Sequence, residues 1–294
     1  MAHYGAMSRS EATAHRDDDL IHNNRILSVA GKIHVARTRC GEASKPTHMK
    51  IALLSDIHGN LQALQACLAD AVSRGAERYV FLGDYVGYGA DPHAVVDVVA
   101  DYAARGAVAV RGNHDEATFG SAAYMNETAQ SAIDYAKRVL SPPQKLFLRN
   151  LPMIVREGNR CFVHASAASP ERYPYIDSPS AALHCAEASQ SAHTFCGHVH
   201  EQRLYFSAQG PKMTLFMPTG GIAVPVPAHR RWVALVGSVG QPRDRIPRAA
   251  YVLFDDAAPG ITFCRVSYDH HRAAARIREV GLPESLAYRV ECGI

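Results

Sequence analysis

The clearest pattern in the sequence is a regular alternation of short apolar runs with longer amphipathic segments between residues 49 and 115. The apolar runs span about 50–55, 78–82 and 107–110, and the amphipathic segments between them span about 61–74 and 91–104. Short runs that alternate with segments of helical periodicity are typical of the strands and helices of parallel βαβ units. We therefore predict a parallel sheet for this part of the chain.

The pattern changes after residue 115, where it predicts helices first and mostly strands later. Helical segments are expected over about 116–122, 127–140, 142–148, 179–189 and 270–280. A hairpin is expected around Glu157-Gly158-Asn159, and a further strand over 193–196. Later apolar runs predict a second, more antiparallel sheet, and they lie at 202–206, 213–217, 231–235, 249–254 and 261–268.

Residues 1–48 have no sustained periodicity, and we predict that they form an N-terminal extension outside the fold. The alternative is a strand or helix near Arg25 to Ala36 that packs on the edge of the domain. In both cases one domain is expected over 49–294, beginning with the strand that follows Met49.

Metal-binding side chains follow the predicted strands where each strand ends. Asp56 and His58 come directly after the first strand, one residue apart, so both face the same side. Seven such residues follow strands along the chain: Asp56, His58, Asp84, Asn113, His164, His198 and His200. Because the carboxyl ends of parallel strands lie along one edge of a sheet, we expect these side chains to meet in space.

The donor atoms in this set indicate the kind of metal and reaction. Imidazole nitrogens mixed with carboxylate and amide oxygens suit Mn, Fe, Zn or Ni better than Mg or Ca, which prefer oxygen ligands alone. Two divalent ions ~3.5–4 Å apart lower the pKa of a bridging water and hold the attacking and leaving oxygens of a displacement at phosphorus. Hydrolysis of a phosphate ester is therefore the expected reaction.

The motifs around these residues resemble those of the calcineurin-like metallophosphoesterase superfamily. They occur in its order and approximate spacing over roughly 49–268, as Asp56-Ile57-His58, Gly83-Asp84, Gly112-Asn113-His114-Asp115, Val163-His164 and Gly197-His198-Val199-His200. A further stretch, Gly237-Ser238-Val239-Gly240-Gln241-Pro242-Arg243-Asp244, is similar to a loop of its bacterial and archaeal phosphodiesterase-like branch. The resemblance implies an α/β fold of two mixed sheets flanked by helices, a four-layer α/β/β/α sandwich.

The resemblance also implies a role for each motif residue. Asp56, His58 and His200 would bind one metal ion and Asn113, His164 and His198 the other, with Asp84 bridging the two. A metal-bridging hydroxide would attack phosphorus, and His114 would protonate the leaving alkoxide or stabilise its charge. Asp115 is predicted to assist by orienting His114.

One motif departs from the protein-phosphatase branch of the superfamily. That branch resembles Gly-Asp-x-Val-Asp-Arg-Gly, whereas this chain has Gly83-Asp84-Tyr85-Val86-Gly87-Tyr88-Gly89. Tyr88 thus replaces an arginine that suits a dianionic monoester, and its absence favours a phosphodiester or nucleotide-type substrate. Arg111 and Arg243 are alternative guanidinium donors to the substrate, and Asn60 is either a phosphate contact or a turn residue.

Two other functions stay open at this stage. The first is a phosphomonoesterase, either a protein phosphatase or a dinucleoside tetraphosphatase. The second is a non-catalytic scaffold that keeps its metals without turnover.

The amino-acid composition indicates which binding partners and which cellular compartment to expect. The chain has 31 Lys and Arg against 28 Asp and Glu, a formal net charge of +3, and no basic patch that favours a nucleic-acid surface. Its seven cysteines have no short paired spacing and are typical of free thiols in a reducing compartment. No signal-peptide pattern and no apolar run of about 18 residues is found. We expect a cytoplasmic protein with a small phosphate-ester substrate and no membrane span, and the sequence leaves its oligomeric state open.

Overall fold

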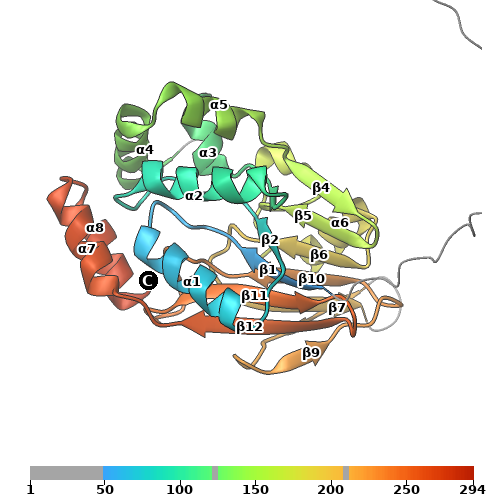
Figure 1. The fold of residues 1–294 in the computed structure, drawn as a ribbon. Coiled ribbons are helices and arrows are strands. Elements are labelled where there is room, and N and C mark those ends of the chain that lie inside the picture. Colours follow the sequence, from blue (N-terminus) through green and yellow to red (C-terminus); the bar gives the residue numbers. More distant parts are fainter. Residues whose placement is uncertain (1–48, 121–124, 208–211) are drawn as a thin grey trace, which may run out of the picture. The chain divides into compact units, whose positions relative to one another are not determined.

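The computed structural model describes residues 49–120, 125–207 and 212–294 (Figure 1). The predicted extension over residues 1–48 lies outside this part and stays a prediction. None of the described helices is both long enough and apolar enough to cross a membrane.

The first sheet has six strands in the order β3-β2-β1-β11-β12-β9. Its parallel part is the one predicted from the sequence, and it consists of β1 (Lys50–Leu54), α1 (Leu61–Ser73), β2 (Arg78–Phe81), α2 (Pro92–Ala104) and β3 (Val108–Ala109). Three antiparallel strands complete it, namely β11 (Ala249–Asp255), β12 (Gly260–Val266) and β9 (Ala223–Pro225). The sheet is therefore mixed.

The second sheet also has six strands, in the order β4-β5-β6-β10-β7-β8. These are β4 (Ile154–Glu157), β5 (Arg160–Val163), β6 (His193–Cys196), β7 (Gln202–Ser207), β8 (Met213–Phe216) and β10 (Trp232–Val236). The strands β5, β6 and β10 pair in parallel and the others pair antiparallel. The placement of the runs at 249–254 and 261–268 in this sheet was wrong, because β11 pairs with β1 instead.

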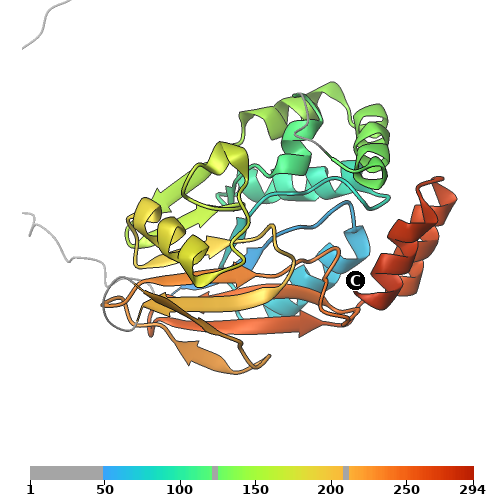
Figure 2. The same ribbon diagram turned by 180° about the vertical axis from the view of Figure 1, so that it is seen from behind.

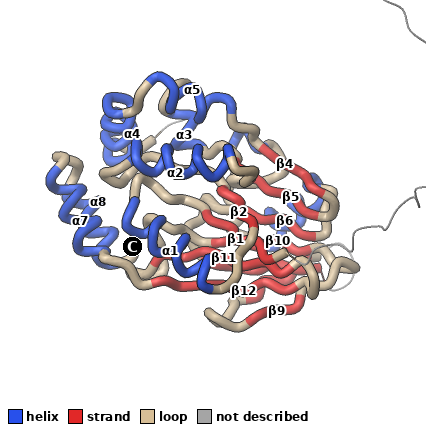
Figure 3. The backbone as a smooth tube through the Cα atoms, viewed as in Figure 1, coloured by secondary structure: helices blue, strands red, loops and turns tan. Residues whose placement is uncertain are grey.

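The two sheets face each other between layers of helices, as Figures 1 and 2 show from opposite sides. Side chains of β1 explain this, because Ile51 and Leu53 join the apolar core between the sheets, whereas Ala52 and Leu54 join the core under the helices. A strand buried on both faces reads as an unbroken apolar run. α6 (Pro179–Ser189) covers the far face of the second sheet. The result is the predicted four-layer α/β/β/α arrangement, in which the strands form the two central layers (Figure 3).

Four further helices lie around the carboxyl edge of the parallel strands. They are α3 (Asn113–Ala117), α4 (Glu127–Val139), α5 (Pro142–Asn150) and α7 (His270–Glu279), with a short 3-10 turn over Pro170–Arg172. α3 begins at Asn113 rather than near residue 116, because Gly112 precedes it and the Asp115 carboxylate accepts the Gly112 N–H. The first turn of this helix therefore carries a predicted metal ligand.

The chain ends in a helix that the sequence analysis missed, α8 (Glu284–Cys292). It forms a hairpin with α7, and the buried Leu286, Ala287 and Val290 pack with Ala273 and Ile277 of α7. The same apolar cluster includes Tyr88 and Ala90. The hairpin thus packs against the loop after β2 that carries Tyr88.

Candidate metal centre

The seven predicted ligands come together at the carboxyl ends of the strands. Three of them form one group, in which His200 Nε2 lies 3.2 Å from Asp56 Oδ1 and 3.1 Å from His58 Nε2. All three side chains are buried, at 0–3% exposure. His58 and His200 are 142 residues apart in sequence.

A second group surrounds His164. Its Nε2 lies 3.3 Å from Asp84 Oδ2, 3.2 Å from His198 Nδ1 and 3.2 Å from Asn113 Oδ1. Asp84 also reaches the first group, because its Oδ2 is 3.7 Å from His58 Nε2. Asp84 therefore stands between the two groups, as a shared ligand would.

Backbone carbonyls fix three of the imidazole rings. The Nδ1 atoms of His58, His164 and His200 lie 3.0, 2.7 and 2.7 Å from the carbonyl oxygens of Val86, Leu82 and Gln241. A carbonyl only accepts, so each Nδ1 must carry the proton and donate it. Each Nε2 then faces the group as the atom that a metal ion would bind, which is how outer partners orient histidine for a metal.

Strained backbone places several of these side chains. Ten non-glycine residues in the described part have positive φ, and five of them are Asp56, His58, Asp84, His198 and His200. This left-handed conformation is unfavourable for residues with a Cβ, and it persists only where surrounding structure imposes it. Here the backbone of Asp56 donates to Gly83 O at 3.0 Å and that of His58 donates to Asp84 O at 2.9 Å. Half of these ten positions are therefore predicted metal ligands.

Close packing leaves room only for glycine at several positions of this site, of which two touch predicted ligand carboxylates. A Cβ on Gly112 would lie 2.2 Å from Asp84 Oδ1, and one on Gly197 would lie 2.4 Å from Asp56 Oδ2. Both distances are far inside van der Waals contact, so a side chain at either position would displace a ligand carboxylate.

The protonation of the ligands suits a cation. Burial lowers the pKa of His58, and burial together with the positive charge of His164 lowers that of His198 to about 3. Burial alone would raise the pKa of Asp84, but His164 and His114 hold it well below its usual value. Burial alone would lower the pKa of His164, but the negative charge of Asp84 raises it to about 9. A metal ion would therefore displace a proton from His164, as metal ligands commonly require.

His114 lies beside the ligands with a free ring atom. Its Nε2 is 4.0 Å from Asp84 Oδ2, and its ring packs 4.8 Å from that of His58 and 4.7 Å from that of Tyr88. Its Nδ1 is buried and has no hydrogen-bond partner in the described part of the chain. Gly87 packs against this nitrogen, so Nε2 is the ring atom that faces the predicted ligands.

Asp115 has a different role from the one predicted. Its Oδ2 accepts the backbone N–H groups of Asp84 and Gly112 at 2.8 and 2.9 Å, and its Oδ1 accepts that of Tyr85 at 2.9 Å. No hydrogen bond among the described residues joins it to the His114 ring. Asp115 therefore holds the backbone of the ligand loops, and its prediction as the residue that orients His114 is corrected.

Asp115→Ala should destabilise the fold by about 4 kcal/mol, because it leaves several buried N–H groups without acceptors. Asp101→Ala is the control, since that side chain is 65% exposed and forms a surface ion pair with Arg105. Urea unfolding of both variants measures the difference. An Asp115→Ala loss no larger than that of the control would contradict the loop-holding role.

Two of the three residues predicted to contact the substrate form hydrogen bonds or ion pairs with other protein groups instead. Both N–H groups of the Asn60 amide are used, one by Gly240 O at 2.9 Å and one by Tyr268 Oη at 3.2 Å, and its Oδ1 caps α1. Arg111 lies against Glu116 at 3.5 Å and donates to Arg149 O at 2.9 Å. Neither is carried forward as a substrate contact, whereas Arg243 is.

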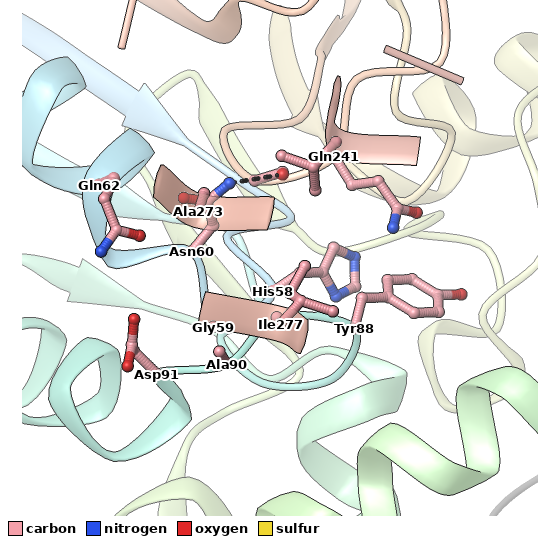
Figure 4. Close-up of a pocket in the computed structure, with 13 residues that line it drawn as sticks. His58, Gly59, Asn60, Gln62, Tyr88, Ala90, Asp91, Gln241, Ala273 and Ile277 are labelled. Carbon is pink, nitrogen blue, oxygen red and sulfur yellow. Dashed lines mark hydrogen bonds between the residues drawn. The ribbon is translucent and has the colours of Figure 1, made fainter. Parts of the chain in front are cut away.

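Residues that were not predicted as site residues line the space next to the ligands. Tyr88 packs 4.5 Å from the His58 ring, and Gln241 lies beside both of them in a cavity bounded by α1, α7 and α8 (Figure 4). Tyr175, 54% exposed, stacks on the His198 ring at 4.2 Å. Gln241 lies in the stretch over residues 237–244, whose similarity to a loop of the phosphodiesterase-like branch was the only sequence signal for it. No sequence pattern pointed to Tyr175.

Residues 49–257 match the calcineurin-like phosphoesterase superfamily domain. The match covers well over half of the chain, which therefore belongs to this superfamily and is a metal-dependent phosphoric ester hydrolase. The buried histidine and aspartate clusters are in keeping with this assignment.

Relatives of similar length come from bacteria and archaea. The uncharacterized protein MJ0912 of Methanocaldococcus jannaschii is 35% identical over 251 residues, covering 83% of this chain and 98% of its own. A crystal structure of a metallophosphoesterase from Sphaerobacter thermophilus has a TM-score of 0.75 and 34% identity, covering 84% of this chain and 100% of its own. The hypothetical protein PH1004 from Pyrococcus horikoshii shares the fold at a TM-score of 0.68 and 19% identity, with coverages of 84% and 99%.

Proposed function

We propose that this protein hydrolyses small phosphodiesters or nucleotide-type substrates with two divalent cations. The observation that carries the substrate class is the position of Tyr88. Its ring packs 4.5 Å from the ring of His58 and 4.7 Å from that of His114, so the side chain next to the candidate acid is neutral and aromatic. A phosphodiester, with a single negative charge, needs a guanidinium here less than a monoester dianion does.

The residues present fit two cations of intermediate hardness, such as Mn, Fe, Zn or Ni. Asp56, His58 and His200 would hold one, and Asn113, His164 and His198 would hold the other, with the Asp84 carboxylate between them. We infer these cations from the donor atoms, which are a mixture of nitrogen and oxygen. Bound there, the cations would supply Lewis acidity that lowers the pKa of a water and neutralises phosphate charge.

The chain's own residues then handle the leaving group. His114 is buried, with an unpaired Nδ1 and with its Nε2 facing Asp84. We assign to it the proton that the departing alkoxide needs. Tyr88 packs on this ring and limits its rotation, and the backbone around it is held by Asp115.

A nucleotide-type substrate is supported by Tyr175. This tyrosine stacks one face on His198 and remains 54% exposed at the rim of the site. Exposed aromatic rings are the usual platforms for bases, because every base has a flat face. We therefore favour a small phosphate ester with a planar group over a phosphoprotein.

The reducing compartment expected from the sequence, most simply the cytoplasm, stays a proposal. It is supported by the six cysteines of the described part, which are all free thiols and of which five are buried.

Protein stripped of metal and reloaded with Mn, Ni, Fe or Zn should hydrolyse bis(p-nitrophenyl) phosphate at a higher kcat/KM than p-nitrophenyl phosphate, by about tenfold or more. The reason is that the monoester's additional charge has no arginine at position 88. Release of p-nitrophenol measures both rates in one assay. Tyr88→Arg is the matched variant and should shift the ratio toward the monoester.

Two results would contradict this proposal. A higher kcat/KM for the monoester would make the protein a phosphomonoesterase. Turnover of neither ester by protein with two bound cations per chain would favour a scaffold.

A further inference from the structure

Two arginines on segments beside the Tyr88 loop have no ion-pair partner in the described part of the chain. They are Arg243, in the loop after β10, and Arg289, on α8. The carboxylates close to them in sequence are used elsewhere, since Asp244 pairs with Arg265 whereas Glu284 and Glu291 pair with Arg278. Their positive charges are therefore left for another anion.

Backbone hydrogen bonds bring the two arginines' elements together. The Arg245 N–H donates to Gly293 O at 2.7 Å, and the Gly293 N–H donates to Arg289 O at 2.8 Å. The end of α8 is thus attached to the loop that carries Arg243. Figures 1 and 2 show the α7–α8 hairpin next to the start of α1, which follows the first metal ligands.

Both elements also lie beside the metal centre. The Gln241 carbonyl oxygen, two residues before Arg243, lies 2.7 Å from Nδ1 of His200. α8 packs in one apolar cluster with Tyr88, whose ring contacts those of His58 and His114.

Unpaired polar atoms lie in the same place. Gln241 is 1% exposed, and neither its Oε1 nor its Nε2 has a hydrogen-bond partner among the described residues. In Figure 4 its amide points toward Tyr88 and His58. The Nε atom of Arg243 is also buried without a partner. Buried polar groups left unpaired in this way call for a ligand.

We propose that Gln241, Arg243 and Arg289 form a second anion site beside the metal centre, which binds a phosphate monoester of the substrate other than the ester being hydrolysed. Guanidinium groups bind phosphate through paired, charge-assisted hydrogen bonds, and the Gln241 amide adds a donor. The site rests on the proposed function, and it narrows the substrate to nucleotides that carry an additional phosphate.

A matched pair of substrates tests this site. Thymidine 5′-(p-nitrophenyl phosphate) and its 3′-phosphorylated form present the same scissile ester and differ by one phosphate monoester. The wild-type protein should have a kcat/KM about tenfold higher for the phosphorylated form, and Arg289→Gln should remove most of that preference by raising KM. Arg289→Lys should keep part of it.

Arg105→Gln is the control for net charge, because Arg105 is 61% exposed and follows α2 at the opposite end of the parallel strands. It should behave as wild type with both substrates. Calorimetric binding of thymidine 3′,5′-bisphosphate to protein loaded with metal gives a second readout, in which Arg289→Gln should weaken binding by about tenfold or more.

The outcomes separate the two proposals. Equal kcat/KM values for the two substrates, together with equal binding of the bisphosphate by wild type and Arg289→Gln, would overturn the second anion site while leaving the phosphodiesterase intact. Turnover of neither substrate would overturn the proposed function, and the binding comparison would then decide the anion site.

Discussion

Asp84→Ala should abolish turnover and the binding of both cations while the chain still folds. Asp84 Oδ2 is 3.3 Å from His164 Nε2 and 3.7 Å from His58 Nε2, so one carboxylate serves both ligand groups. Without it the remaining ligands carry only the charge of Asp56. We expect kcat/KM to fall by at least about a thousandfold, since metal ions contribute several kcal/mol to such reactions.

Metal analysis and calorimetry on the purified variant measure this outcome. Circular dichroism establishes that the variant is folded, and Asp101→Ala controls for loss of an aspartate at the surface. A folded Asp84→Ala protein that keeps two cations per chain would show that Asp84 is not the shared ligand.

His114→Asn should slow turnover about 10²–10⁴-fold and leave the metal content unchanged, because general acid catalysis contributes that much. The ring lies beside Asp84, but its backbone N–H rather than its side chain is bonded to that carboxylate, at 2.8 Å. The ligand loop should therefore keep its shape in the variant.

The leaving group distinguishes an acid from a residue that only supports the site. A p-nitrophenolate departs readily without a proton, whereas an alkoxide does not, so His114→Asn should affect an alkyl ester far more than a p-nitrophenyl ester. Equal losses on both esters would assign His114 a positioning role, and no loss on either would remove it from the reaction. His184→Asn, on the exposed side of α6, is the matched control.

Asp115 shows the limit of reasoning from neighbouring residues. Its place next to His114 suggested that it orients that ring, but in a helix consecutive side chains point in different directions. The structure turns the Asp115 carboxylate toward the backbone of residues 84, 85 and 112. Asn60 was undecided between turn and substrate for a related reason, because its partners, Gly240 and Tyr268, are about 180 and 208 residues away in sequence.

The sequence by itself determined the parallel strands, their helices and the set of candidate metal ligands. These follow from local periodicity and from side chains placed where a strand ends, which depend only on nearby residues. Only the tertiary structure decided that β11 joins β1, that α8 packs against the Tyr88 loop, and that the loop carrying Gln241 and Arg243 is attached to the end of α8. Such contacts join distant segments through packing and backbone hydrogen bonds, and no local pattern encodes which segments meet.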